Sequence, residues 1–186
     1  MKRKISIILL GILFLTQNPA FAKKARLGDI TITNTYDGLE LAYLNVKGTF
    51  TAEMRKAVLS GVPTTFLFFV TVYKVRRFWS DNQIADIQIT HTIKYHNLKK
   101  EFVIRRSWEK NKPITVKSFK EARKLMSEIS HLKIVPSDKL EKGTRYQLRA
   151  KAKLGKVTLP LYLHYILMFV SLWDFETDWH TIDFVY

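Results

Sequence analysis

The 186-residue chain contains no cysteine, which excludes disulfide scaffolds and the cysteine-linked lipid of a bacterial lipoprotein. Glycine and proline are scarce, at seven and five residues, so collagen-like and low-complexity classes are excluded as well. With 47% hydrophobic and 25% charged residues, the composition is that of an ordinary globular chain. A chain of this length is expected to form one domain.

Long apolar runs are also few, and the one near the start, residues 5–15, is too short to span a bilayer as a helix. It follows basic residues at positions 2–4 and precedes the small-residue pattern Ala20-Phe21-Ala22. This arrangement is typical of a signal peptide. We therefore expect residues 1–22 to be a signal peptide cleaved after Ala22, leaving 23–186 as a single β-rich periplasmic domain. An uncleaved anchor is the alternative.

Acidic residues are outnumbered, with 16 Asp and Glu against 31 Lys and Arg. Removing the three basic residues of the signal peptide leaves 28 against 16, a net charge of +12. An exported protein does not meet cytosolic nucleic acid, so no nucleic-acid partner is expected. The expected partner is an anionic envelope component, such as a lipid head group or lipopolysaccharide, or the outer region of a membrane protein.

The first part of the domain shows hairpin and helix signals. Two strand-like runs, residues 30–33 and 39–46, flank an Asp-Gly step at Asp37, which is typical of a hairpin. Residues 51–60 have apolar side chains at helical spacing, and Gly61 is suited to end that helix.

The middle of the chain is rich in β-formers. Residues 64–79 carry apolar side chains at odd and even positions alike, which predicts a strand covered on both faces. Residues 85–95 and 102–108 should continue it as an antiparallel meander. Ser118 and Glu121 form a capping-box pattern, so a helix should start there and end before Pro136.

From Arg145 the sequence again alternates, with apolar residues at even positions between 146 and 154. Together these patterns predict a mainly β (β-rich α+β) fold. We expect an antiparallel β-sandwich or strongly bent sheet of about seven strands with two or three packed helices.

The same strand presents a row of cations, which is the candidate binding surface: Arg145, Arg149, Lys151 and Lys153. Cations at this spacing repel each other unless an anion neutralises them. That anion is either an external partner or the chain's own Asp174, Glu176 and Asp178. These three acids lie in the acidic cluster 174–183, for which a cation site is the other interpretation.

A third cluster combines Arg77 with the rings of Tyr73 and Trp79 and with Asp81. Alternation along a strand places Arg77 between the two rings. We favour a buried structural brace over an exposed recognition patch.

Residues 157–173 have no formal charge but are interrupted by Pro160, so we expect a strand end and then a short buried segment. Peripheral membrane contact through residues 162–172, from Tyr162 to Leu172, is the alternative.

Motifs for catalysis are lacking. The glycines form no phosphate-binding cluster, and the five histidines have no metal-ligand spacing. No serine lies in a nucleophile elbow. We therefore expect no enzyme, no metal and no cofactor.

Several segments together resemble the proteobacterial exported proteins of domain-of-unknown-function family 4390. They are Gly61-Val62-Pro63, residues 76–81, residues 95–98, Ser118-Phe119, residues 146–149, Leu159-Pro160 and residues 173–179. The resemblance implies an envelope location and transfers no site residue. It also implies a link to a membrane sensor kinase. Among its signature residues, we interpret five as structural: Arg76, Arg77, Trp79, Asp81 and Tyr95.

The leading functional hypothesis is a periplasmic, non-enzymatic binding or accessory module of the cell envelope. One rival is a small outer-membrane β-barrel, suggested by the C-terminal residues 182–186. The other is a hydrolase whose site is assembled from distant residues.

Overall fold

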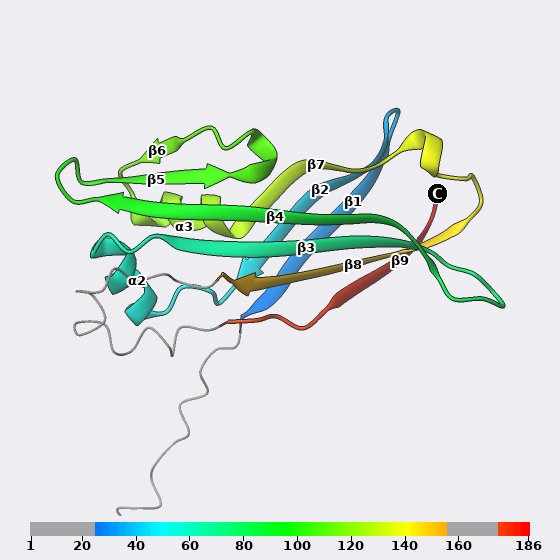
Figure 1. Ribbon diagram of the computed structural model, residues 1–186, viewed down its shortest axis with the longest axis horizontal. Coiled ribbons are helices and arrows are strands. Elements are labelled where there is room, and N and C mark those ends of the chain that lie inside the picture. The colour runs from blue at the N-terminus through cyan, green and yellow to red at the C-terminus, as the bar shows by residue number, and fades with distance from the viewer. Residues whose placement is uncertain (1–24, 156–174) are drawn as a thin grey trace, which may run out of the picture.

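The computed structural model describes residues 25–155 and 175–186. The expected signal peptide 1–22 and the apolar segment 157–173, with its alternative membrane contact, lie outside these residues. The described residues form two antiparallel sheets (Figure 1). The smaller sheet has the order β1-β2-β7: β1 (Arg26–Thr35), β2 (Gly38–Lys47) and β7 (Glu128–Pro136).

The larger sheet has the order β6-β5-β4-β3-β8-β9. Its strands are β6 (Ile114–Val116), β5 (Glu101–Arg106), β4 (Asn82–His96), β3 (Thr64–Lys74), β8 (Arg145–Leu154) and β9 (His180–Val185). Figure 1 shows β1 and β2 crossing behind this sheet at an angle, with α2 (Ala52–Leu59) and α3 (Phe119–Ser127) at one end. The predicted β-rich α+β fold is confirmed, with nine strands and two α-helices in the described residues instead of about seven strands.

The core lies between the two sheets because strands of both sheets turn one face inward. On β3 the inward face consists of Phe66, Phe68, Val70 and Val72, and none of these side chains is exposed. The inward residues of β8 from Tyr146 to Ala152 are equally buried, as the alternation predicted, and Leu154 at the end of the strand is partly buried. The smaller sheet contributes Leu39, Leu41 and Leu44 from β2 and Ile129 from β7 to the same core.

Local signals explain the first elements. Tyr36 and Asp37 form the two-residue turn between β1 and β2, because Thr35 pairs with Gly38. The Thr51 side chain accepts a hydrogen bond from the Met54 N–H and so caps α2. Gly61 ends this helix with a φ of +85°, a conformation that favours glycine.

The helix predicted from Ser118 toward Pro136 is only partly correct. α3 ends at Ser127, and β7 begins at the next residue and pairs with β2, with Ile129 opposite Leu44. Ser118 occupies the cap position but its side chain makes no capping hydrogen bond. Pairing with β2 satisfies the backbone of residues 128–136, and this tertiary contact overrides the local helical pattern.

The strand predicted over residues 64–79 ends at Lys74, and its two faces are not equally covered. The inward face is buried, while Leu67, Phe69 and Tyr73 on the other face are half-buried. No second layer of strands covers this outer face in the described part of the chain. Long side chains of β8 lie over it instead.

Candidate binding surfaces

The predicted row of cations lies on β8, but its members differ in exposure. Arg145 is exposed at the start of the strand, whereas Arg149, Lys151 and Lys153 are half-buried. The odd positions of β8 share the outer face of the sheet with the odd positions of β3, since Phe69 pairs with Lys151 and Leu67 with Lys153. The predicted row therefore divides into the exposed Arg145 and a half-buried group of Arg149, Lys151 and Lys153.

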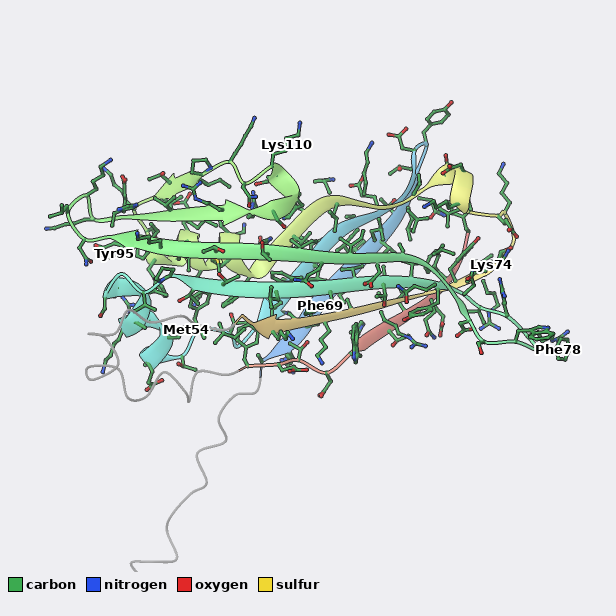
Figure 2. The ribbon with its side chains drawn as sticks, in the orientation of Figure 1. Met54, Phe69, Lys74, Phe78, Tyr95 and Lys110 are labelled. Atoms are coloured by element: carbon green, nitrogen blue, oxygen red, sulfur yellow. The ribbon has the colours of Figure 1, made fainter. Side chains whose placement is uncertain are left out.

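Each cation of that group lies over an aromatic ring. The Arg149 guanidinium carbon is 4.7 Å from the centroid of the Tyr73 ring. Lys151 Nζ is 5.4 Å from the Trp179 ring, and Lys153 Nζ is 5.1 Å from the Phe69 ring (Figure 2 labels Phe69). Cation–π contacts of this kind contribute about 0.5–1 kcal/mol each at exposed sites. The aromatic rings thus hold the cations close to the sheet.

One acid of the chain neutralises the middle of this group. Glu176 forms a salt bridge with Lys151 and lies opposite Lys153 in an antiparallel bridge. The hydrogen bond from Lys151, followed by the charges of Lys151 and Lys153, holds the pKa of Glu176 below its ordinary value. The interpretation that the chain's own acids pair with the row is therefore confirmed for Glu176. Asp174 lies outside the described residues.

The cation site suggested for the acidic cluster is not formed by the described residues. Within residues 25–155 and 175–186, no three His, Asp or Glu side chains converge as metal ligands. Glu176 is engaged by Lys151, and Asp183 accepts a hydrogen bond from Gln147.

Arg149 lies in a pocket on this outer face. Its Nε donates to Gln147 Oε1 at 2.6 Å, and Gln147 Nε2 donates to Asp183 Oδ1 at 2.9 Å. Together with the Tyr73 ring, this chain of hydrogen bonds fixes the orientation of the guanidinium. The pocket has a volume of about 480 Å³ and is lined by Thr71, Tyr73, Gln147, Arg149, Trp179 and Thr181.

The buried brace predicted around Trp79 is wrong. Trp79 is 80% exposed and neighbouring Phe78 is 86% exposed, at the tip of the hairpin that joins β3 to β4. The cation over Tyr73 is Arg149 and not Arg77, because β3 ends before Arg77 can continue its alternation. Asp81 does fix the turn, but its carboxylate accepts from the backbone N–H of Arg76 at 3.2 Å.

Tyr95 is the signature residue that packs against another aromatic ring. It is half-buried on β4, and its ring centroid lies 4.6 Å from that of Phe102 on β5. Tyr95 and Phe102 are paired across the two strands, so the ring contact fixes the register at this end of the meander.

Sequence reasoning missed His91, which is completely buried on β4. Its Nδ1 lies 3.0 Å from the carbonyl oxygen of Met126, and Trp108 Nε1 donates to its Nε2 at 3.0 Å. Burial lowers the pKa of His91 from 6.5 to about 4. The signal was available: His91 shares the inward parity of Ile89 and Ile93.

Residues 22–183 match the model of a family described as Domain of unknown function (DUF4390). The chain belongs to this family. No curated protein and no solved structure matches the DUF4390 chain. The matched residues include the surfaces described above, and the end of β9 after residue 183 lies outside the match.

No described helix of this DUF4390 protein, in residues 25–155 and 175–186, has the length and apolar character needed to cross a bilayer.

Proposed function

We propose that this DUF4390 protein is an exported, non-enzymatic binding module of the cell envelope that holds an anionic group of its partner at Arg149. One observation carries the proposal: the guanidinium is oriented by the Tyr73 ring and by Gln147 within a pocket that Trp179 also lines. The Nε donor is used by Gln147, and the terminal nitrogens carry the other four N–H donors. Such a planar fork matches a carboxylate or a phosphate.

The lining of the pocket favours binding over catalysis. Its six described residues include two threonine hydroxyls, one amide and two aromatic rings, but no His, Asp or Glu that could act as a general base. Aromatic rings beside hydrogen-bonding groups suit a ligand with both a flat apolar face and polar atoms. An acidic saccharide or a phosphorylated headgroup of the envelope has this chemistry.

A titration with defined anions tests the site at Arg149. The probes are a galacturonic acid trimer, which carries carboxylates, glycerol phosphate, and a neutral galactose trimer as control. We expect at least one anion to change the tryptophan fluorescence, because Trp179 lines the pocket, and the neutral trimer to have no effect. Charge-assisted hydrogen bonds contribute about 1.5–3 kcal/mol, so Arg149→Gln should weaken binding by at least about tenfold.

Arg145→Gln is the matched control, since Arg145 is on the same strand and the same outer face but does not line the pocket. Its affinity for the anion should equal that of the unsubstituted chain. Equal binding by the Arg149→Gln variant, with the fold unchanged by circular dichroism, would disprove the proposed site.

Export has its own test. The pattern in residues 1–22 supports cleavage after Ala22, so the intact mass of protein recovered from the periplasmic fraction should correspond to a chain that begins at Lys23. A recovered chain that retains residues 5–15, or protein found only in the cytosol, would contradict the proposed export.

A further inference from the structure

The tip of the β3–β4 hairpin carries a surface that the Arg149 site does not use. Residues 75–81 connect the two strands, and Arg76, Arg77, Phe78 and Trp79 in this connection are all exposed. Figure 2 shows Phe78 at the far end of the molecule, beyond the last paired residues of the sheet. We name these four residues the hairpin tip.

Two large aromatic side chains this exposed are costly to keep in water. Phe78 and Trp79 are 86% and 80% exposed, and they are adjacent in the chain, so together they form one apolar projection. The turn that joins β1 to β2 and exposes Tyr36 differs, because Tyr36 is a single ring followed by Asp37, whose carboxylate is paired with Lys133. The hairpin tip therefore differs from an ordinary exposed turn in the amount of exposed aromatic surface and in its charge.

The hairpin presents this projection on a defined support. β3 and β4 remain paired as far as Lys74 and Asn82, directly before the tip. Val75 N–H donates to the Arg145 carbonyl oxygen at 3.0 Å, and Asp81 accepts from the Arg76 N–H. The tip is thus held at the end of a long ribbon and does not fold back onto the sheet.

Charge at this end of the fold is positive. Five cations lie at the base of the tip or in it, namely Lys74, Arg76, Arg77, Lys139 and Arg145. Three acids accompany them: Asp81, Asp138 and Glu141. Glu141 is occupied by a salt bridge to Lys74, and Asp81 is occupied by the turn. The salt bridges among the described residues include neither Arg76 nor Arg77, so both guanidinium groups are available to an outside partner.

We propose that the hairpin tip binds the surface of an anionic lipid bilayer. Phe78 and Trp79 enter the boundary between head groups and acyl chains, where amphipathic and apolar rings are favoured. Arg76 and Arg77 contact lipid phosphates, which match the guanidinium fork. The complementarity between two adjacent rings and two adjacent arginines on one projection selects a bilayer interface as the occupant. This surface is separate from the proposed anion site at Arg149 and goes beyond it.

Vesicle co-sedimentation tests the assignment. The purified chain is mixed with vesicles of phosphatidylcholine alone or with added phosphatidylglycerol, and each variant is prepared in the same form. Each arginine near an anionic surface strengthens binding by about fivefold, so Arg76→Gln with Arg77→Gln should weaken binding to the anionic vesicles by about 25-fold. Phe78→Ser with Trp79→Ser should weaken it by at least about tenfold. Tyr36→Ser, the matched control at the other exposed turn, should bind normally.

Location is tested with a probe at the tip, because the chain has no native cysteine to compete for labelling. An environment-sensitive fluorophore on Ser80→Cys should shift to shorter wavelength on anionic vesicles, while the same label on Asn97→Cys, in the turn between β4 and β5, should not. Unchanged binding by the Phe78→Ser, Trp79→Ser variant would overturn the proposal. A wavelength shift only for the label at position 97 would overturn it too. So would a tip variant that still binds lipid but loses binding to a protein.

The proposed anion site and the proposed lipid contact can be contradicted independently of each other. Arg149→Gln should leave the wavelength shift of the label at position 80 on anionic vesicles unchanged, and the tip variants should leave binding of the soluble anions unchanged. Loss of vesicle binding in Arg149→Gln together with normal binding by the tip variants would move lipid contact to the outer face of β8 and contradict the tip assignment.

Discussion

Acidification from pH 7.5 to pH 5.0 is expected to lower the free energy of unfolding by about 2 kcal/mol through His91. This side chain is completely buried, and burial lowers its pKa to about 4 in the folded protein, against 6.5 for the ordinary value. Its nearest neighbours are apolar or neutral, including the Phe68 ring at 4.8 Å between centroids. The nearby charge that lowers the pKa further belongs to Arg106.

The direction follows from which state binds the proton more tightly. Because the folded pKa is depressed, the unfolded chain takes up a proton at His91 between pH 6.5 and pH 4 while the folded protein does not. The stabilising effect of neutral His91 is fully present above pH 6.5 and is lost as the pH falls toward 4. The hydrogen bond from Trp108 acts in the same direction, since Nε2 accepts it and a protonated Nε2 would be a second donor facing that N–H. The hydrogen bond with the Met126 backbone acts in the opposite direction, but burial outweighs it.

Chemical denaturation at the two pH values measures the effect, and His91→Gln provides the matched control. A glutamine amide can donate to the Met126 carbonyl and accept from Trp108, but it does not titrate. The free energy of unfolding of this variant should change by less than about 0.5 kcal/mol over the range attributed to His91. Contributions from the exposed histidines are common to both proteins and cancel in the difference. An equal acid loss in both proteins would contradict the assignment.

His91 also shows what the sequence could and could not reveal. Its burial was readable, because it occupies the inward parity of β4 between Ile89 and Ile93. Its hydrogen-bond partners were not readable, since Trp108 lies after β5 and Met126 lies in α3. Pairings across such distances in sequence depend on how the strands and helices pack. A single sequence specifies each local pattern but does not specify those contacts.

On the outer face of β8, too, the local pattern could be predicted from the sequence but the contacts could not. Alternation from Arg145 onward predicted which residues point inward and which cations point outward, and both expectations hold. The rings beneath the cations come from β3 and from the segment before β9, through the sheet order β3-β8-β9. The Arg149 pocket could therefore not be assembled from sequence, although one of its members was already a candidate.

Trp79 was misjudged for a different reason. Apolar residues continue past Lys74, so alternation alone extended the strand to Trp79 and placed its ring against the fold. The pairing of β3 with both of its neighbours ends at Lys74, which lies opposite Asn82 on β4 and Tyr146 on β8. Beyond it the chain leaves the sheet, and hydrophobic residues there are exposed at the hairpin tip.

The contrast between a buried and an exposed aromatic residue gives the largest expected change in stability. Phe66 on β3 is completely buried, and its ring centroid lies 5.1 Å from that of Phe50 and 4.9 Å from that of Phe175. Phe66→Ala removes these contacts and leaves a cavity, so the free energy of unfolding should fall by about 3–5 kcal/mol. Trp79→Ala should change it by no more than about 0.5 kcal/mol.

Urea denaturation followed by far-ultraviolet circular dichroism measures both variants without depending on tryptophan emission. A loss of several kcal/mol in Trp79→Ala would mean that the tip packs against the fold, and would weaken the case for its contact with lipid. A small loss in Phe66→Ala would contradict the packing of the core.

Phe66 also links the core to the outer face of β8. Phe175, which packs against it, immediately precedes Glu176, and the Phe175 carbonyl oxygen accepts a hydrogen bond from the Leu154 N–H. Loss of the Phe66 ring removes a contact that holds this segment beside β8, and with it the position of Glu176 against Lys151. A less constrained Glu176 should have a pKa closer to its ordinary value, which carboxylate NMR titration can follow. Phe66→Ala should therefore raise the pKa of Glu176, whereas Trp79→Ala should leave it unchanged.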